Sequence, residues 1–295
     1  MDPITVFTIV ILFVLGSVVG SFLNVVIYRL PRGESIVYPG SHCPRCGRAL
    51  TAADLVPLLS WLLLRGRCRS CAARISARYF GVEMLTALLF VGAFHSEHFS
   101  IQGDPASLPF HLASVAHKLI LVCLFVPIIF IDQDHRIVPD ELSVPLLLVG
   151  FAWNVVSGLM GQPWLVSIVT HKEPGLFSLS LPTSLVFAMV CAGVFWLIQW
   201  FGEIIFRKEA MGLGDVNIAA GVGANFALLD AFCSFGIAIS VGALIGVVLI
   251  LLRKRDRTDQ LAFGPMLLTG ALVMMLIPDK IHRLVEMYRA TLGGG

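Results

Sequence analysis

The sequence predicts an all-α polytopic membrane protein with about eight transmembrane helices and one large polar loop. Of its 295 residues, 57% are hydrophobic and only 14% are charged, and the mean hydropathy is +0.87. Soluble domains carry about 25% charged residues, so this composition excludes an ordinary globular core. Apolar runs also recur along the chain at close to the length that crosses a bilayer, about 20 residues. Together these observations indicate a bundle of membrane-spanning helices.

Eight apolar segments have a length that suits, or nearly suits, a membrane-spanning helix. They cover 4–27, 79–97, 114–131, 141–160, 180–205, 214–229, 231–252 and 262–279. The 214–229 segment is short and rich in Gly and Ala, which makes it the weakest of the set. No basic stretch precedes the first segment and no signal cleavage site is evident, so we expect a retained first helix within 1–28.

The distribution of Lys and Arg sets the expected orientation, because cytoplasmic loops are enriched in both. With the N-terminus outside, the inner loops are 29–78, 132–140, 206–213 and 253–261, and they hold 16 of the 21 Lys and Arg residues. We therefore expect a multi-pass protein whose 29–78 loop is cytoplasmic. Orientation and lipid headgroups explain the basic clusters Arg207–Lys208 and Arg253–Arg255. We expect membrane lipid, and no nucleic acid, as a partner.

The 29–78 loop contains two C-x-x-C pairs, which account for four of the seven cysteines. Two such pairs at this separation are typical of a tetrahedral zinc site with four cysteine ligands. The loop is short and poor in large apolar residues, so metal binding would supply folding energy that a core does not. Two disulfides or free thiols are the alternatives, and a reducing cytoplasm argues against disulfides. We predict a cytoplasmic zinc-binding loop domain at 29–78 with the ligands Cys43, Cys46, Cys68 and Cys71. The other cysteines lie in apolar segments and are expected to be packing residues: Cys123, Cys191 and Cys233.

Two acidic motifs stand at the ends of apolar segments. Asp132 opens Asp-Gln-Asp-His-Arg-Ile-Val-Pro-Asp directly after one apolar run, and Asp215 ends Gly-Leu-Gly-Asp at the start of another. Carboxylates at membrane depth are costly and are usually functional. Both motifs fall on the cytoplasmic side under the charge-based orientation, and two converging carboxylates can share a proton and activate water. The alternative is structural, with polar turns between helices in which Asp215 and Asp140 act as N-caps.

Glu83 lies inside the apolar run that follows Arg78. An acid placed one turn into a membrane helix is a functional candidate. It could equally pair with Arg78 in a structural role, and the residues alone leave both interpretations open.

A set of short motifs runs in order along nearly the whole chain. The motifs are Gly20-Ser-Phe-Leu-Asn24-Val-Val-Ile-Tyr-Arg29-Leu-Pro31, the two C-x-x-C pairs, Arg78-Tyr-Phe-Gly-Val-Glu83, Ile131-Asp-Gln-Asp-His-Arg-Ile-Val-Pro-Asp140, Gly212-Leu-Gly-Asp215 and Phe263-Gly-Pro265. This ordered set resembles the type IV prepilin peptidases, the bifunctional leader peptidase/N-methyltransferases of the GxGD-type membrane aspartic peptidases. Any one motif is weak, whereas the ordered set is highly specific.

The resemblance implies a bacterial inner-membrane aspartic peptidase with its site on the cytoplasmic side of a multi-helix domain at 79–295. It implies that Asp132 and Asp215 are the catalytic pair. The substrates would be type IV prepilins or pilin-like pseudopilins of secretion systems, cut after a glycine that ends a short basic leader. The four-cysteine loop is linked to the bifunctional members, so N-methylation of the new N-terminus with S-adenosylmethionine is implied as well. Glu83 is the candidate residue for methyl transfer.

Two other functions are compatible with the same residues. An ion-coupled transporter would use Asp132 and Asp215 as a proton or cation relay, and it would not need a cytoplasmic metal site. A non-catalytic membrane scaffold would use its zinc ribbon to dock a cytoplasmic partner. In that protein both aspartates could be replaced without loss of function.

Overall fold

The computed structural model describes residues 2–101, 107–162, 165–167, 180–206, 212–251 and 262–293. These residues form two compact units, Met1–His135 and Arg136–Gly295. The basic clusters predicted at 207–208 and 253–255 lie outside the described residues. Each unit is described separately below.

Every one of the eight predicted segments forms a helix, and the predicted all-α membrane fold is confirmed. The helices are α1 (Pro3–Arg29), α3 (Ala77–Ile101), α4 (Leu108–His135), α5 (Asp140–Leu159), α6 (Thr183–Phe206), α7 (Leu213–Asn225), α8 (Leu228–Leu251) and α9 (Gly264–Leu276). The 29–78 loop adds the 3₁₀ turns η1 (Leu30–Arg32) and η2 (Ala52–Asp54) and the short helix α2 (Leu59–Leu63). The strands β1 (Leu165–Ser167) and β2 (Ser180–Pro182) form a small antiparallel pair.

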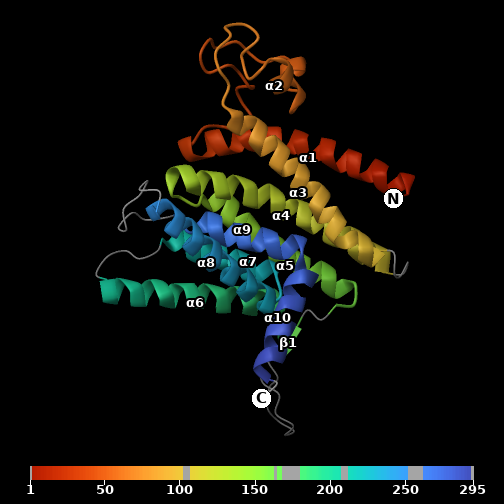
Figure 1. Cartoon of the computed structure of the whole chain (residues 1–295), viewed down its shortest axis with the longest axis vertical. Helices are drawn as coiled ribbons and strands as arrows, with labels where there is room; N and C mark the ends of the chain where they lie inside the picture. The colour runs from red at the N-terminus through yellow and green to blue at the C-terminus, as the bar shows by residue number, and fades with distance from the viewer. Residues whose placement is uncertain are drawn as a thin grey trace. The chain divides into compact units, whose positions relative to one another are not determined.

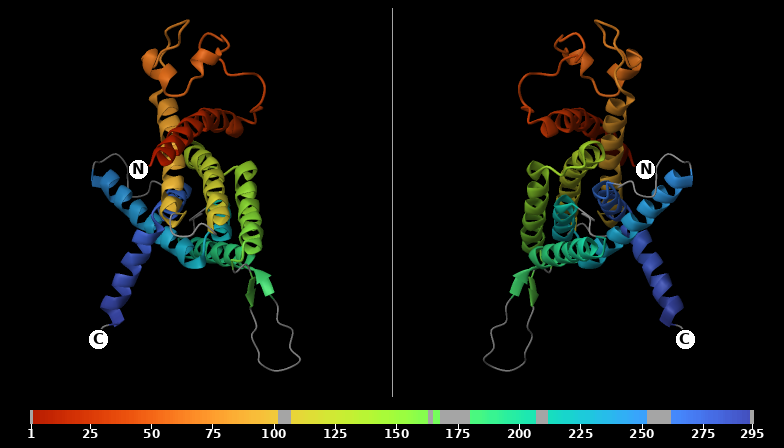
Figure 2. Two further views of the ribbon diagram at one scale, coloured as in Figure 1. Left: turned by 90° about the vertical axis from the view of Figure 1, so that its right-hand side faces the viewer. Right: turned by 90° about the vertical axis from the view of Figure 1, so that its left-hand side faces the viewer.

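Not all of these helices are long enough to span a membrane alone. Among the described residues, six are long and apolar enough to cross: α1, α3, α4, α5, α6 and α8. Helix α7 has only 13 residues, which is about 20 Å at 1.5 Å per residue. Helix α9 continues into α10 (Pro278–Gly293) through a 95° bend, and the pair counts as a seventh span if it is taken as one. Figure 2 shows α10 leading away from α9 to the C-terminus.

In the first unit, α1 and α3 pack closely because two glycines of α1 face the backbone of α3. A Cβ added at Gly16 would lie 2.7 Å from the Ala87 Cα, and one added at Gly20 would lie 2.8 Å from the Glu83 Cα. Small residues allow this close approach between membrane helices. The Asn24 side-chain amide also donates to the Tyr79 carbonyl at 3.0 Å. The 29–78 loop therefore connects two helices, α1 and α3, that pack closely against each other (Figure 1).

In the second unit, α7 is surrounded by its neighbours and forms the core. Its residues from Ile218 to Asn225 are buried. A Cβ at Gly221 would lie 2.6 Å from Leu146 Cδ2 on α5, and one at Gly223 would lie 2.5 Å from the Phe187 carbonyl oxygen on α6. The Asn225 amide donates to the carbonyls of Leu146 and Gly221, both at 2.8 Å. The glycine-rich composition that weakens α7 as a span is what allows this close packing.

The contact between α1 and α3 can be tested with one methyl group. Replacing Gly20 with Ala should lower the thermal unfolding midpoint of the detergent-solubilised protein by several degrees, because overpacking costs about 1–3 kcal/mol. Gly81 on α3 is the matched control, since a Cβ there meets nothing within 4 Å. Gly81→Ala should leave the midpoint unchanged or raise it slightly. Equal midpoints for the two variants would contradict the close α1–α3 contact.

Candidate metal cluster and catalytic carboxylates

The four cysteines of the 29–78 loop lie together and form a group that could hold a metal ion. Their four sulfur atoms all lie within 4.8 Å of one another. The Cys43 and Cys71 sulfurs are 3.9 Å apart, which agrees with the spacing of about 3.8 Å between thiolates on a tetrahedral zinc with Zn–S bonds near 2.3 Å. Cys43 and Cys68 are buried, whereas Cys46 and Cys71 are exposed. The donor set and geometry fit zinc.

The two C-x-x-C pairs have the same local fold. In the first, the Cys43 N–H donates to the Arg48 carbonyl at 2.9 Å, and in the second the Cys68 N–H donates to the Ala73 carbonyl at 2.8 Å. The residue after the second cysteine of each pair has a positive φ, +69° at Gly47 and +54° at Ala72. This turn points backbone N–H groups at the sulfur atoms, as a metal knuckle requires.

Those backbone N–H groups shift the thiol pKa values. The Cys46 and Arg45 N–H groups lower the pKa of Cys43, and the Cys71 and Ser70 N–H groups lower the pKa of Cys68 to about 6. The Ala73 N–H also lowers the pKa of Cys71, but burial and the neighbouring sulfurs outweigh it and raise that pKa to about 11. Four crowded thiolates therefore need a cation to be stable together.

Asp54 joins η2 to the second knuckle. Its carboxylate accepts hydrogen bonds from the Thr51 hydroxyl at 2.8 Å and from the Arg69 guanidinium at 2.6 Å. These two contacts lower the pKa of Asp54 to about 2. The ion pair therefore remains intact across the whole neutral range of pH.

Glu83 connects the 29–78 loop to α3. Its Oε2 accepts a buried hydrogen bond of 2.8 Å from the Leu58 N–H, and only 9% of the residue is exposed. Leu58 has a φ of +62°, an unusual conformation for a branched residue. Next to it, the rings of Trp61 and Phe80 lie 5.2 Å apart. The predicted alternative, a pair between Glu83 and Arg78, is not what the structure shows.

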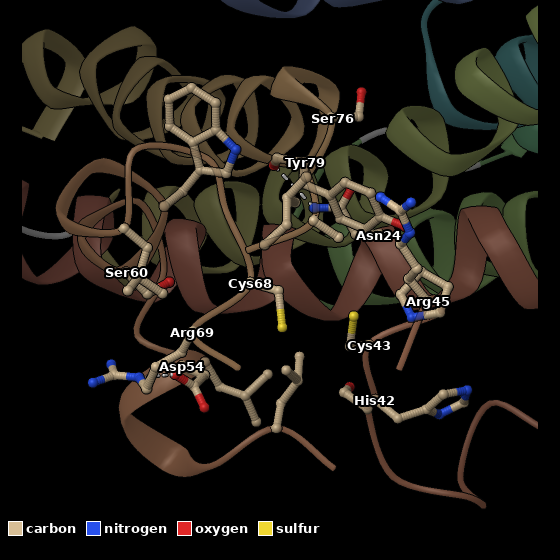
Figure 3. Close-up of a pocket in the computed structure, with 18 of the residues that line it drawn as sticks. Asn24, His42, Cys43, Arg45, Asp54, Ser60, Cys68, Arg69, Ser76 and Tyr79 are labelled. Carbon is tan, nitrogen blue, oxygen red and sulfur yellow. Dashed lines mark hydrogen bonds and ion pairs between the residues drawn. The ribbon is translucent and has the colours of Figure 1, made fainter. Parts of the chain in front are cut away.

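A cavity of about 910 Å³ lies between the 29–78 loop and the ends of α1 and α3. Figure 3 shows Cys43 and Cys68 on its loop side and the Asn24–Tyr79 hydrogen bond on its helix side. Glu83, Trp61 and Phe80 also line it. The Trp61 Nε1 atom is buried and has no hydrogen-bond partner among the described residues. The volume falls in the range of small-molecule sites, about 300–1,000 Å³.

Asp132 lies in the last part of α4, and only 6% of the residue is exposed. Arg78, at the start of α3, holds this end of α4. It forms an ion pair with Asp134, donates to the Phe130 carbonyl at 3.3 Å and lies over the Phe130 ring at 4.9 Å. Asp134 therefore helps to fix the helix end that carries Asp132.

Asp215 lies in the first turn of α7, in the second unit. Gly212 is the N-cap of this helix, so the alternative that Asp215 serves as the N-cap is not observed. The positive end of the helix dipole favours a negative charge in this first turn. A Cβ at Gly214 would lie 2.8 Å from Val138 Cγ2, so only glycine lets the 136–139 segment pack here. Asp140 likewise follows its N-cap, Pro139, as the first residue of α5.

Three residues of these sites are not evident from sequence reasoning alone. Leu58 acts through its backbone N–H, which any residue could supply. Trp61 looks like one more apolar residue of Leu-Ser-Trp-Leu-Leu. Arg78 opens the matching Arg78–Glu83 motif and is a candidate partner for Glu83, but its contacts with Asp134 and Phe130 of α4 are not predicted.

The cysteine cluster predicts that the purified protein carries one zinc ion per chain. Cys43→Ser and Cys71→Ser should each lose most of this metal, because three thiolates bind it less well than four. Elemental analysis of protein purified under reducing conditions measures the content. Cys233→Ser is the matched control, since Cys233 lies in α8, and it should keep its zinc. Metal-free wild-type protein would contradict the assignment.

Comparisons with known proteins cover nearly the whole chain. Residues 14–96 match the "Bacterial Peptidase A24 N-terminal domain" and residues 119–247 match the "Type IV leader peptidase family". The chain is 34% identical to the prepilin leader peptidase/N-methyltransferase of Aeromonas hydrophila over 95% of this chain and 94% of that relative. The proteins of the same name from Myxococcus xanthus and Pseudomonas aeruginosa are 37% and 31% identical, over 83% and 91% of this chain and 64% and 90% of theirs.

No solved structure matches the chain. The two family matches include both acidic motifs and all four clustered cysteines. The similarity to the first relative extends over almost the full length of both proteins. This protein therefore belongs to the type IV leader peptidase family.

Proposed function

We propose that this protein removes the basic leader peptide from type IV prepilins or pilin-like secretion subunits and then N-methylates the new N-terminal residue. The observation that carries the proposal is its near full-length similarity to prepilin leader peptidase/N-methyltransferases. Nothing in the described residues favours a transporter or a scaffold over this enzyme. The 16 Lys and Arg residues of the loops 29–78, 132–140, 206–213 and 253–261 support an orientation with both proposed sites on the cytoplasmic side.

Asp132 and Asp215 are the proposed peptidase pair. Asp132 is a buried acid in a membrane helix, where carboxylates usually have a function. Asp215 follows Gly214, which packs on Val138, and Val138 comes shortly after Asp132 in the chain. One carboxylate, ionised, takes a proton from water, and the other, protonated, donates to the leaving amine. Mutual repulsion separates their proton affinities, so the two titrate as one coupled unit.

The cavity beside the 29–78 loop is the proposed site of methyl transfer. When bound, S-adenosylmethionine supplies the methyl group from a positively charged sulfur. The cavity fits this group in size, and the Glu83 carboxylate and the aromatic faces of Trp61 and Phe80 line it. A carboxylate and aromatic rings both attract a cation. Glu83 would take the proton that the substrate amine loses.

Zinc has a structural role in this proposal. The cysteine cluster fixes the two knuckles that form the loop side of the cavity (Figure 3). Structural zinc sites supply folding energy to short segments that lack a core. The 29–78 loop, together with Glu83 of α3, would thus carry methylation, and the helices that hold Asp132 and Asp215 would carry cleavage.

The peptidase proposal predicts the effect of single neutral substitutions. Asp132→Asn and Asp215→Asn should each lower prepilin cleavage by at least about 100-fold, because each removes one partner of the acid–base pair. Asp134→Asn is the comparison from the same motif; Asn keeps an oxygen that can accept from Arg78, so this variant should cleave at a rate much closer to wild type. Cleavage of a prepilin by purified protein measures all three. A near-normal cleavage rate for either Asp132→Asn or Asp215→Asn would contradict the aspartic mechanism.

The methylation proposal predicts that the two activities separate. Glu83→Gln keeps an oxygen that accepts the Leu58 N–H but loses the charge, so it should still cleave while methylation falls by about 10-fold or more. Asp132→Asn and Asp215→Asn should still methylate a pilin whose leader has already been removed. Mass spectrometry of the mature N-terminus measures methylation.

A second variant at the same position separates charge from architecture. Glu83→Ala loses the acceptor as well, so its loop should become more protease-sensitive, whereas the loop of Glu83→Gln should not. If a folded Asp215→Asn protein also failed to methylate the pre-cut pilin, the two reactions would share one site. That result would overturn the assignment of methylation to the first unit.

A further inference from the structure

Helix α2 has one face packed on α3 and one face that the described residues leave largely exposed. Leu58, just before the helix, and Trp61 face α3 through the Glu83 hydrogen bond and the Phe80 ring. The opposite side, which we call the outer face of α2, consists of three leucines that are 58%, 52% and 81% exposed: Leu59, Leu62 and Leu63. The preceding residues Leu55 and Val56 are each 42% exposed and extend this apolar surface.

The contacts of α2 place it at the depth of a membrane surface. It touches Phe80 and Glu83, which lie in the first two turns of a helix that is long and apolar enough to span. Glu83 lies about 9 Å from the start of α3 at 1.5 Å per residue. Interfacial helices bury their apolar faces about 5–10 Å into the boundary between headgroups and acyl chains. At that depth the outer face of α2 lies within reach of the lipid headgroups.

The charge of the surrounding loop is strongly positive. Residues 29–78 contain nine arginines and two acids, and one of the acids, Asp54, is already bound to Arg69. Arg65 and Arg67 follow α2 almost directly, and both are exposed. An apolar face bordered by arginines matches the two parts of an anionic phospholipid, its acyl chains and its headgroup.

We propose that the outer face of α2 docks on anionic phospholipid at the headgroup level of the bilayer. The loop is then held at the membrane from two sides, by Glu83 of α3 within the protein and by lipid outside it. A pilin substrate is the other candidate occupant for an apolar face. The substrate of the proposed function carries a basic leader, which the exposed Arg65 and Arg67 beside α2 would repel, whereas the same arginines attract an anionic headgroup.

The test uses the full-length protein in lipid nanodiscs with a photo-reactive benzoylphenylalanine in place of Leu63, and in a second variant in place of Leu62. The same residue in place of Arg45 is the control, because Arg45 is exposed on the first knuckle of the same loop. Discs contain either phosphatidylglycerol or phosphatidylcholine, and mass spectrometry identifies the adducts. Zinc content and thermal midpoint verify that each variant is folded.

Positions 62 and 63 should form several-fold more phospholipid adducts than position 45, and more in phosphatidylglycerol than in phosphatidylcholine. Equal lipid adducts at all three positions would overturn the docking proposal. Equal yields in the two lipids would overturn the choice of an anionic partner. Adducts that move from lipid to an added prepilin would assign the surface to the substrate instead. Because no reading depends on enzyme activity, the outcome is separate from the fate of the proposed function.

Discussion

The hydrogen bond from the Leu58 N–H to the Glu83 carboxylate joins the polar loop to the membrane helices. A carboxylate inside an apolar helix must find a partner, because an unpaired one is very costly there. Here the partner is a backbone group held in an uncommon conformation with φ of +62°. The contact positions α2, brings Trp61 onto Phe80 and forms one wall of the cavity. The close approach of Gly20 to Glu83 fixes the helix that carries the acceptor.

Two kinds of contact, rather than a hydrophobic core, stabilise the 29–78 loop. The cysteine cluster closes it on itself, and ion pairs such as Asp54–Arg69 connect its turns. Glu83 and Trp61 then fasten the closed loop to α3. The geometry of the cysteine cluster and the cost of a carboxylate in a membrane helix thus act on the same short segment. The cavity lies between these two sets of contacts, with the cysteine cluster on its loop side and Glu83 on its helix side.

Much of the fold could be predicted because its signals are local. Long apolar runs give the helix positions to within a few residues, and the C-x-x-C spacing gives the cysteine cluster. Contacts between residues that are far apart in the sequence could not be predicted, because they depend on how the chain folds in three dimensions. The partner of Glu83 is a backbone N–H 25 residues earlier, and Arg78 reaches Asp134 across 56 residues. The sequence does predict a break between 214–229 and 231–252, but α7 ends earlier, at Asn225, whose side-chain amide donates to the Leu146 carbonyl 79 residues away.

The shortness of α7 has a consequence for how water reaches a membrane-embedded reaction. A helix of 13 residues covers about 20 Å, whereas the hydrocarbon core is about 30 Å thick. Its Asn225 end is buried in protein and sealed by hydrogen bonds, but its Asp215 end is only partly covered. Hydration is therefore confined to one end of the helix. If Asp215 acts in hydrolysis as proposed, water would reach it from that end, without an aqueous channel along the whole helix.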